Sequence, residues 1–561
     1  MITFGLVNQE IQSSAYVASE NLTYYSQSNG VFGSLGDRSI YGTLEKDFTT
    51  ASGTMYLLPR NEPGKVYLDT GLTSSTLISD GTVAVVIDFG LETSIDYKGL
   101  TINFGSNYPT SFDIESGNQT IEVRNNTESI YQTEEVFEGA TDLTITVYSM
   151  LKPQTRLRIF NIKFGYGLVF DNDDVLDATL TSYVSPIAEN VPQFDFSVRL
   201  INYDKYFNVD NPDSAVNFLE TGQEVKVTYG YQLPESEEIE WVDGAVMYCS
   251  QWSSDDNAAV ISAQDIFRNM EGEYYKGVVG NISYYELATR VFADAGISEY
   301  EIDNSLQNMY TSNPLPRITH KEALQMIANA TRCVLTVNRA GTIQIIPHTE
   351  MYGTPVDFRM ERVDMLSSPN AIKQELVKDV TVPRYVYQEG GDELTLLSEE
   401  ITATAGMVQT FYFTDPSYGY RATFNESATN VWFVASGAYY ITIKFLIAGT
   451  YQLDIYGSKY QVIQSNHRAV INSHGKSVLW ENPLISDATM ASALVTWLGE
   501  YYASKIEYEY QTRGNPELDT SDVIYQDNDF VDDMKVILYR QTLGFNGAFS
   551  GNVTVRREND S

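Results

Sequence analysis

The chain has 561 residues, which is too long for a single hydrophobic core and indicates several domains. Hydrophobic residues make up 43% and charged residues 20%, proportions that exclude a largely disordered protein. The 36 Lys and Arg residues against 74 Asp and Glu give a net charge of −38, which opposes binding to nucleic acid and to anionic membranes because both attract cations.

Cysteine content and hydropathy indicate the compartment. Two cysteines, Cys249 and Cys333, are too few for a disulfide framework. The first residues, MITFGLVNQE, lack the basic and apolar regions of a signal peptide. The most apolar run, AYYITIKFLIAG, is too short to span a bilayer. These features predict a soluble protein without a membrane anchor, made in a reducing cytoplasm.

The first third of the chain predicts an arm and a sandwich. Residues 1–55 are rich in Ser, Asn and Gly, and they predict an extended N-terminal arm with a few short strands. Beyond them, β-branched and aromatic runs recur at the spacing typical of a sandwich. They predict one β-sandwich over residues 56–170, with strands beginning near Val83, Gly99, Ser111, Thr120, Leu143 and Arg156.

Residues 171–275 predict a further strand-rich domain with a sharp corner. The run DNDDVLDATL interrupts the strand pattern, which resumes where Phe194, Phe196, Val198 and Leu200 alternate with polar residues. In the stretch NVDNPDSAVNFLETGQEVKVTYGYQ, Asn-Pro favours a turn, Ser214 can cap a short helical segment, and Gly222 can end that segment in the left-handed conformation. The stretch predicts a strand–corner–strand connection that turns a sheet through a fixed angle.

Two helices are predicted next. Ser283 and Thr319 each precede a glutamate by three residues, which is the pattern of a capping box, and Gly296 can end the first helix. A hairpin over residues 335–347, with Ala-Gly in its turn, follows the second helix. Together these elements predict a helical α/β unit over residues 276–350.

The remaining chain predicts a β-rich domain over residues 351–483 and a C-terminal helix with strands over residues 484–561. Within the first, Tyr439, Ile441, Ile443, Phe445 and Ile447 alternate in one strand, and the run GTYQLDIYG can return beside it. A helix near residues 486–504 places five apolar residues on one face, Met490, Leu494, Trp497, Leu498 and Tyr501. Two strands separated by a Gly-Asn-Pro turn follow.

Residues for catalysis are scarce. The four histidines are His320, His348, His467 and His474. None lies in a recognised catalytic motif, so we interpret them as surface or packed side chains, and the two cysteines as small buried hydrophobic residues. Phosphate-loop, dinucleotide-binding, nucleophile-elbow and zinc-protease motifs are not found in a convincing context. We therefore predict no catalytic residue and no enzyme activity.

Acidic runs are the candidate metal sites. The run from Asp171 begins with calcium-loop spacing at Asp173, but it has Val175 at the fifth position and Ser182 where an EF-hand has Glu. The run DTSDVIYQDNDFVDD also lacks the spacing. Solvated acidic loops are the favoured interpretation, and a calcium site built on loop carbonyls is the alternative. The prediction is no metal and no cofactor.

The first sandwich resembles a known group of modules. Its ending RLRIFNIKFG, with YPTSF upstream, is similar to discoidin-like carbohydrate-binding β-sandwiches. Members of that group often bind sugars or membranes through loops at one end, so the resemblance implies glycan binding. The block contains no Trp, and a spacer domain is the alternative.

From about residue 176 the chain resembles the tail-hub, or baseplate, proteins of bacteriophages that infect Gram-positive hosts. The resemblance rests on FDFSVRLINYDKYFNVDNPDSAVNFLETGQEVKVTYGY, NPLPRITHKEALQMIANATRCVL and RGNPELDTSDVI. It implies a mainly β fold in which two hub barrel domains, at 171–275 and 484–561, form a ring that continues the tail tube. The helical unit and the β-rich domain lie between them.

This resemblance implies a structural virion protein at the distal end of the tail, assembled in the host cytoplasm as a trimer. The implied partners are further copies, the distal tail, tape-measure and receptor-binding tail proteins, and host cell-surface glycans, without sequence-specific nucleic acid. Two alternatives stay open. One is a carbohydrate-binding adhesion protein of the tail, and the other is a cell-wall hydrolase with an unrecognised carboxylate site.

Overall fold

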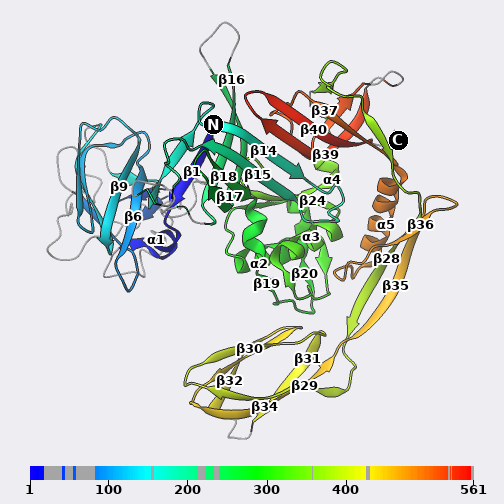
Figure 1. Ribbon diagram of the computed structural model, residues 1–561. Coiled ribbons are helices and arrows are strands. Elements are labelled where there is room, and N and C mark those ends of the chain that lie inside the picture. The colour runs from blue at the N-terminus through cyan, green and yellow to red at the C-terminus, as the bar shows by residue number, and fades with distance from the viewer. Residues whose placement is uncertain are drawn as a thin grey trace. The chain divides into compact units, whose positions relative to one another are not determined.

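The structure is a computed structural model that describes residues 1–17, 41–43, 55–57, 83–152, 157–208, 210–211, 219, 221–232, 239–356, 358–424, 430–527, 531 and 533–557. Within these residues the protein is mainly β, which confirms the predicted fold class (Figure 1). The chain divides into two compact units. Unit 1 holds Met1–Asp174, Leu200–Val227 and Tyr248–Ile261, and unit 2 holds Val175–Arg199, Thr228–Met247 and Ser262–Ser561.

Unit 1 contains a β-sandwich. Its five-stranded sheet has the order β2 (Tyr16–Val17), β5 (Val83–Asp88), β10 (Asp142–Met150), β7 (Pro109–Ser116) and β8 (Gln119–Arg124). A three-stranded sheet has the order β12 (Asn161–Lys163), β6 (Ile95–Asn103) and β9 (Ile130–Ala140). A small third sheet has the order β11 (Arg158–Ile159), β3 (Tyr41–Thr43) and β4 (Met55–Leu57).

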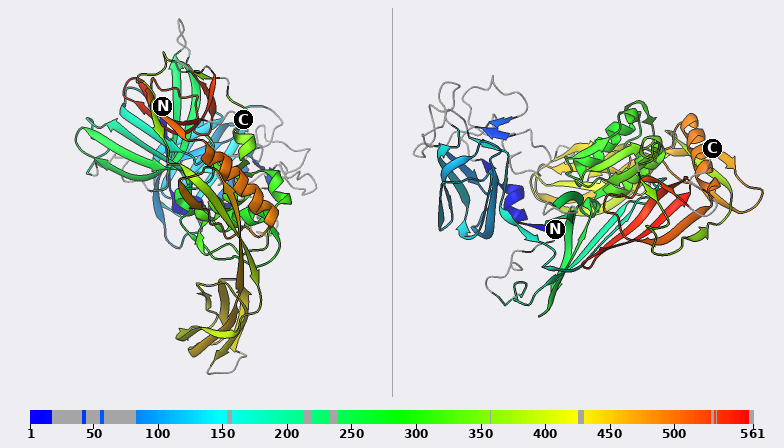
Figure 2. Two further views of the ribbon diagram at one scale, coloured as in Figure 1. Left: turned by 90° about the vertical axis from the view of Figure 1, so that its right-hand side faces the viewer. Right: turned by 90° about the horizontal axis from the view of Figure 1, so that it is seen from above.

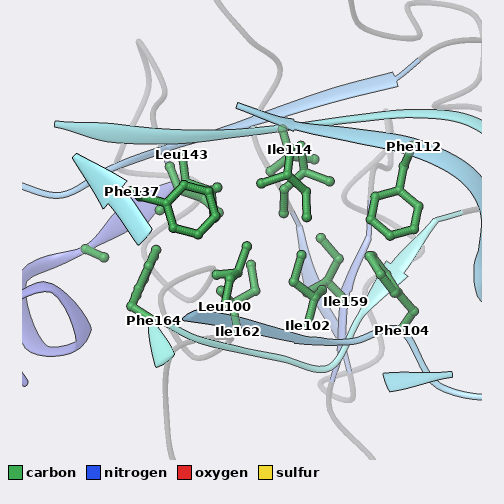
Figure 3. Close-up of a cluster of buried hydrophobic side chains, with 14 of the residues drawn as sticks. Leu100, Ile102, Phe104, Phe112, Ile114, Phe137, Leu143, Ile159, Ile162 and Phe164 are labelled. Carbon is green, nitrogen blue, oxygen red and sulfur yellow. The ribbon is translucent and has the colours of Figure 1, made fainter. Parts of the chain in front are cut away.

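The core of this sandwich is aromatic and aliphatic (Figure 3). Tyr97 stacks on Phe137 with ring centroids 4.7 Å apart, and Phe104 meets Phe112 edge to face. Ile11, from α1 (Gln9–Ser14), is fully buried in the same core. The first residues of the chain therefore complete the sandwich, whereas the sequence predicts an arm for them.

Five of the predicted sandwich strands are confirmed as β5, β6, β7, β8 and β10. The sixth, from Arg156, is interrupted at Phe160 and forms the short strands β11 and β12. The sequence does not predict β9, because three glutamates in IYQTEEVFEGA interrupt the apolar pattern that is typical of a strand. Only Phe137 and Ala140 of that strand are buried.

Unit 1 also contains the start of a longer sheet. Here β1 (Ile2–Val7) pairs antiparallel with β13 (Gly165–Phe170) and with the first residues of β16 (Glu224–Gln232). Three further strands, like β16, run across the division between the units: β15 (Gln193–Ile201), β17 (Ile239–Ser254) and β18 (Ala258–Gln264). In β15 the predicted alternation is confirmed, since Phe196, Val198 and Leu200 are buried.

The corner before β16 is described in part. Gly222 has φ +92°, and its N–H donates to the Cys249 carbonyl oxygen at 2.8 Å, so the predicted left-handed residue is confirmed. Ser214, the predicted cap, lies outside the described residues. The interruption predicted from Asp171 is shorter than expected, because β14 (Val175–Tyr183) begins four residues later. Most β14 side chains are half-buried on both faces, and the sequence of this strand therefore shows little alternation of apolar and polar residues.

In unit 2, strands from distant parts of the chain share one sheet. Its order is β14, β39 (Met534–Phe545), β40 (Phe549–Arg557), β37 (Ile506–Thr512) and β27 (Asn370–Lys373). Next to β39 lies β38 (Val523–Gln526), which pairs with β26 (Arg359–Met360). One side of this sheet covers a core that includes Met360, Tyr510, Val553 and Val555.

The helical unit forms as predicted. Ser283 accepts a hydrogen bond from the Glu286 N–H and begins α2 (Tyr284–Asp294), and Thr319 forms a complete capping box before α3 (His320–Thr331). Gly296, with φ +72°, follows the end of α2. The predicted hairpin consists of β24 (Cys333–Val337) and β25 (Ile343–Pro347). The smaller elements are η4 (Ile266–Met270), β19 (Glu273–Tyr274), β20 (Ile282–Ser283), β21 (Tyr300–Ile302), η5 (Asn304–Asn308), β22 (Tyr310–Thr311), β23 (Ile318–Thr319) and α4 (His348–Met351).

A second sandwich lies between residues 389 and 460. One sheet has the order β29 (Glu393–Ala403), β34 (Gly449–Lys459) and β31 (Ser417–Phe424). The other sheet has the order β30 (Val408–Tyr412), β33 (Tyr440–Phe445) and β32 (Val431–Ser436). The prediction that GTYQLDIYG returns beside the strand at 439–447 is wrong, because β33 and β34 belong to opposite sheets. Ile443 and Leu453 are both buried in the core between them, and Ile447 is exposed.

Two long strands join this second sandwich to the rest of unit 2. They are β28 (Val377–Gln388) and β35 (Gln461–Val470), which pair antiparallel, with β36 (Lys476–Leu479) parallel to β28 (Figures 1 and 2). The predicted C-terminal helix is α5 (Ala488–Ala503), which packs on β28 and β35. Leu494, Trp497 and Leu498 of the predicted face are buried.

Candidate functional site

One side of the sheet β14-β39-β40-β37 in unit 2 is polar. Cross-strand pairing places Tyr183, Arg540, Thr554 and Glu509 in one row, and Thr181, Thr542, Asn552 and Gln511 in the next. We call the side that carries these two rows the polar face. A groove of about 480 Å³ follows it, and Asp195 and Glu507 also line this groove.

Strand alternation makes this face polar. In β40, Val553 and Val555 point into the core, whereas Asn552 and Thr554, one residue away, lie on the polar face. In β14, Thr181 and Tyr183 line the groove, whereas Ser182 is buried on the opposite side. Because side chains alternate along every strand, the core and the polar face are fixed by the same register.

Charged side chains on the polar face are few, and two of them form an ion pair. Glu507 accepts a hydrogen bond from Arg556 at 2.8 Å, and both side chains are about one-tenth exposed. The Arg556 guanidinium also lies 3.9 Å from the centre of the Tyr501 ring. The Arg540 guanidinium lies over the Tyr183 ring at 5.4 Å. The face therefore presents hydroxyls, amides and carboxylates rather than a row of cations.

The opposite side of this region holds a small cavity of about 180 Å³. Asp265 and Asp522 line it, and burial raises the pKa of Asp265 to about 7 and that of Asp522 to about 6. The Asp265 carboxylate accepts the N–H groups of Phe194 at 2.8 Å and Phe267 at 2.9 Å. Asp265 thus caps η4 and fixes the start of β15, which is a structural task.

Arg339 closes one side of this cavity. Its guanidinium donates to the Asp519 carboxylate at 2.7 Å, to the Glu517 carbonyl oxygen at 2.7 Å and to the Asp243 carbonyl oxygen at 2.9 Å. These three residues lie in the loop between β37 and β38 and in β17. One side chain from the β24–β25 turn therefore ties together parts of the chain that are far apart in sequence.

The histidines lie in separate places. His320 is buried at the start of α3, and its Nε2 lies 3.0 Å from an Asp294 oxygen. His348 lies against Trp497 and Tyr352, and burial lowers its pKa to about 4. The remaining pair, His467 and His474, contact the serines Ser492 and Ser473. Both cysteines are buried, as predicted, and burial raises the pKa of Cys333 to about 12.

The acidic runs accept hydrogen bonds from their own turn or pair with arginines elsewhere in the chain. Asp171 and Asp174 accept backbone N–H groups of the turn before β14. In the run DTSDVIYQDNDFVDD, Asp519 pairs with Arg339, and Asp527 and Asp533 pair with Arg359. The part of the chain that the structure describes contains no group of three or more His, Cys, Asp or Glu side chains able to hold a metal ion.

The unit 1 sandwich has a polar groove of about 480 Å³. It is lined by Lys98, Asn118, Gln119, Glu134, Glu135, Val136 and Glu138. Gly117, with φ +54°, lies beside it, and a Cβ there would meet the Glu138 carbonyl oxygen at 2.1 Å. The groove offers amides and carboxylates but no aromatic ring. Among the helices of the described segments, none is long and apolar enough to cross a membrane.

Comparisons with known proteins give distant structural likenesses. No family model and no curated protein sequence matches this chain. Solved structures similar to it include a 43 kDa tail protein of prophage MuSo2 from Shewanella oneidensis, at 10% identity and TM-score 0.37 over 80% of this chain and 98% of that one. A tail protein from Neisseria meningitidis MC58 has 8% identity and TM-score 0.40 over 70% and 94%.

A third similar structure is the prophage tail protein gp18 from Listeria monocytogenes EGD-e, with 10% identity and TM-score 0.36 over 71% of this chain and 93% of that one. All three are described as tail proteins of prophages or bacteria. At such identities and TM-scores the likeness assigns no function. It is a distant similarity of backbone structure to these tail proteins.

Proposed function

We propose that this chain is a structural subunit of a phage tail, the hub at its distal end, where three copies form a ring. The observation that carries the proposal is the pairing of β14 with β39, which places Thr181 opposite Thr542. The tail-hub resemblance implies two barrel domains contributed by separated parts of the chain. A sheet shared by residues 175–183 and 506–557 supports that arrangement.

The polar face supports a role as the wall of a passage. In a ring this face would line the lumen through which the genome leaves. Asp195 and Glu509 repel phosphates, and the guanidinium of Arg556 is already paired with Glu507. A wall that holds few free cations lets DNA slide, whereas a row of lysines would retain it.

The proposed partners are further copies of the chain, the distal tail and tape-measure proteins on the tube side, and receptor-binding tail proteins on the host side. In this proposal the chain performs assembly and gating and makes or breaks no bond. Incubation with purified Gram-positive cell walls should release fragments at the background rate. If fragments are released, and substitution of a single Asp or Glu abolishes this release, the chain is a cell-wall hydrolase and the hub proposal is wrong.

Localisation on the particle tests the hub proposal. Gold-labelled antibodies against the chain should decorate the distal tip of the tail in electron micrographs of intact particles. Label on the capsid, or evenly along the tube, would exclude a hub. Antibodies against a major tube protein serve as the control, because they should label the whole length of the tail.

Glycan binding by the unit 1 sandwich is the second candidate, and the polar groove at Asn118 and Gln119 favours it over a plain spacer. Amides and carboxylates are the groups that hydrogen-bond sugar hydroxyls. The full chain should bind members of a glycan array, and Asn118→Ala with Gln119→Ala should abolish the signal. Equal signals from the wild type and this variant would place glycan binding outside this groove, and no signal from either would leave the spacer interpretation.

A further inference from the structure

The second sandwich is open along one side. Strands β31 and β32 end its two sheets, and a groove of about 590 Å³ runs between them. Ile441 forms part of the floor, and the Tyr420 hydroxyl donates to the Gly437 carbonyl oxygen at 2.9 Å. At one end, the Ala438 N–H donates to the Gly277 carbonyl oxygen at 2.8 Å. The groove is thus lined by residues of both sheets.

Strand β32 borders this groove and exposes large apolar side chains. Trp432 is 65% exposed, Phe433 47% and Val434 52%. Within the described residues β32 pairs with β33 alone, so its second edge carries unpaired backbone groups. Free edges in natural proteins usually carry lysine, proline or inward-pointing charges. The sequence VWFVAS has none of these, and a bulge near Val434 is its one protective feature.

The groove is also uncharged. The residues that line it include no Asp, Glu, Lys, Arg or His. The whole chain has a net charge of −38, so two copies repel each other over most of their surfaces. A contact between copies is therefore favoured where both surfaces lack carboxylates, and the β32 edge is such a surface.

A matching edge exists on β35. Its first six residues, QVIQSN, carry no charge, and Val462 and Ile463 are 47% and 52% exposed. Among the described strands β35 pairs with β28 alone. The edge strand β29, by contrast, carries Glu393, Glu399 and Glu400. β35 therefore offers a neutral, apolar edge like that of β32, which β29 lacks.

We propose that β32 of one copy pairs with β35 of a second copy and extends the sheet β30-β33-β32 across the interface. The inference rests on the proposed ring, because a contact between two different surfaces of the same chain is head to tail, and such a contact forms a closed ring when its rotation closes and an open filament when it does not. Strand addition pairs the free backbone groups and covers Trp432 and Ile463 together. A lipid surface would cover the side chains but leave those backbone groups unpaired in hydrocarbon, which is costly.

Cysteine cross-linking tests this pairing. Both native cysteines are buried, so Val434→Cys and Ile463→Cys each add one accessible thiol. When the two single variants are mixed and treated with a short bismaleimide, a covalent dimer should form in the mixture only. A matched control pairs Ile463→Cys with Leu394→Cys, an equally exposed position on β29, and should give background. Dimers from Val434→Cys alone would indicate β32–β32 pairing and overturn the proposal.

A charge exchange gives an independent readout. Val434→Glu should weaken self-association at least tenfold in sedimentation equilibrium, and mixing it with Ile463→Lys should restore association. Unchanged association of Val434→Glu would overturn the strand contact and leave the hub proposal intact. Failure of the hub proposal would instead appear in the antibody labelling, which does not depend on this interface.

Discussion

The side-chain oxygens of Thr181 and Thr542 lie 3.3 Å apart, although 361 residues separate the two positions. The helical unit, the second sandwich and α5 are all inserted between them. The entropy cost of closing a chain grows only slowly with its length, so a folded insertion of this size is tolerated. The two paired strands therefore behave as one structural element, and the inserted parts are free to serve other contacts.

The burial of Ile11 predicts that the N-terminal segment stabilises the unit 1 sandwich. Ile11→Ala should lower the free energy of unfolding by roughly 2–5 kcal/mol, because it removes a fully buried side chain and leaves a cavity. Ile130→Ala is the control, since Ile130 is 51% exposed in the same sandwich and should change little. Urea unfolding of the full chain measures both. Equal effects would show that α1 does not belong to this core.

The corner before β16 predicts a backbone effect at Gly222. No atom lies within 4 Å of a Cβ built there, so any cost of substitution comes from φ +92° alone. Gly222→Val should destabilise the protein by roughly 1–2 kcal/mol, because a β-branched residue is strained in the left-handed region. Gly222→Asn should cost less, since Asn tolerates that region. Identical melting curves for both variants and the wild type would contradict this account of the corner.

The three hydrogen bonds of Arg339 predict a larger loss than those of an exposed arginine. Arg339→Ala should cost about 1–2 kcal/mol, because it removes three hydrogen bonds made by a side chain that is only 21% exposed. Arg199 pairs with Asp177 at 2.9 Å, but both side chains are about half exposed, so Arg199→Ala should cost less than about 1 kcal/mol. Denaturant midpoints compare the two. A larger loss for Arg199→Ala would contradict the role of Arg339 as a tie.

Asp265 predicts a specific pH dependence. Its carboxyl has a pKa of about 7 when folded and about 4 when unfolded, so the folded state holds the proton more tightly between these values. The stability that this proton contributes is present at low pH and is lost as pH rises from about 4 to 7. Asp195 lies nearby and favours the neutral form, whereas Lys321 opposes it.

Asp265→Asn isolates this contribution. The variant carries no titrating group, so its free energy of unfolding should approach that of the wild type, or exceed it, as pH rises from 5 to 8. Carboxyl groups elsewhere contribute equally to both proteins and cancel in the difference. If the free energies of unfolding of the wild type and the variant differ by a constant amount from pH 5 to 8, the raised pKa of Asp265 is contradicted.

Local signals in the sequence are sufficient for the helices and for several strands. The capping residues Ser283 and Thr319 and the end signal Gly296 act over a few residues, so they are visible without the fold. Strands with one buried face, such as β15, show the expected alternation. By contrast, β9 and β14 have mixed burial on both faces, and alternation does not reveal them.

Long-range pairing is not visible in the sequence. The alternation of β33 predicts a strand correctly, but it does not say that β34 returns in the opposite sheet. The polar face also depends on long-range pairing, because Tyr183, Arg540 and Glu509 form a row only through the registers of three strand pairs. Hydroxyl and amide residues occur in many strands, so the residue types alone do not predict the polar face.

A structure of the assembled protein by electron cryomicroscopy tests whether the chain forms a ring. We expect a closed ring of three copies whose lumen is lined by the polar face, with Asp195 and Glu509 facing the passage. A monomer at high concentration, an open filament, or a lumen lined by Lys and Arg side chains would contradict it.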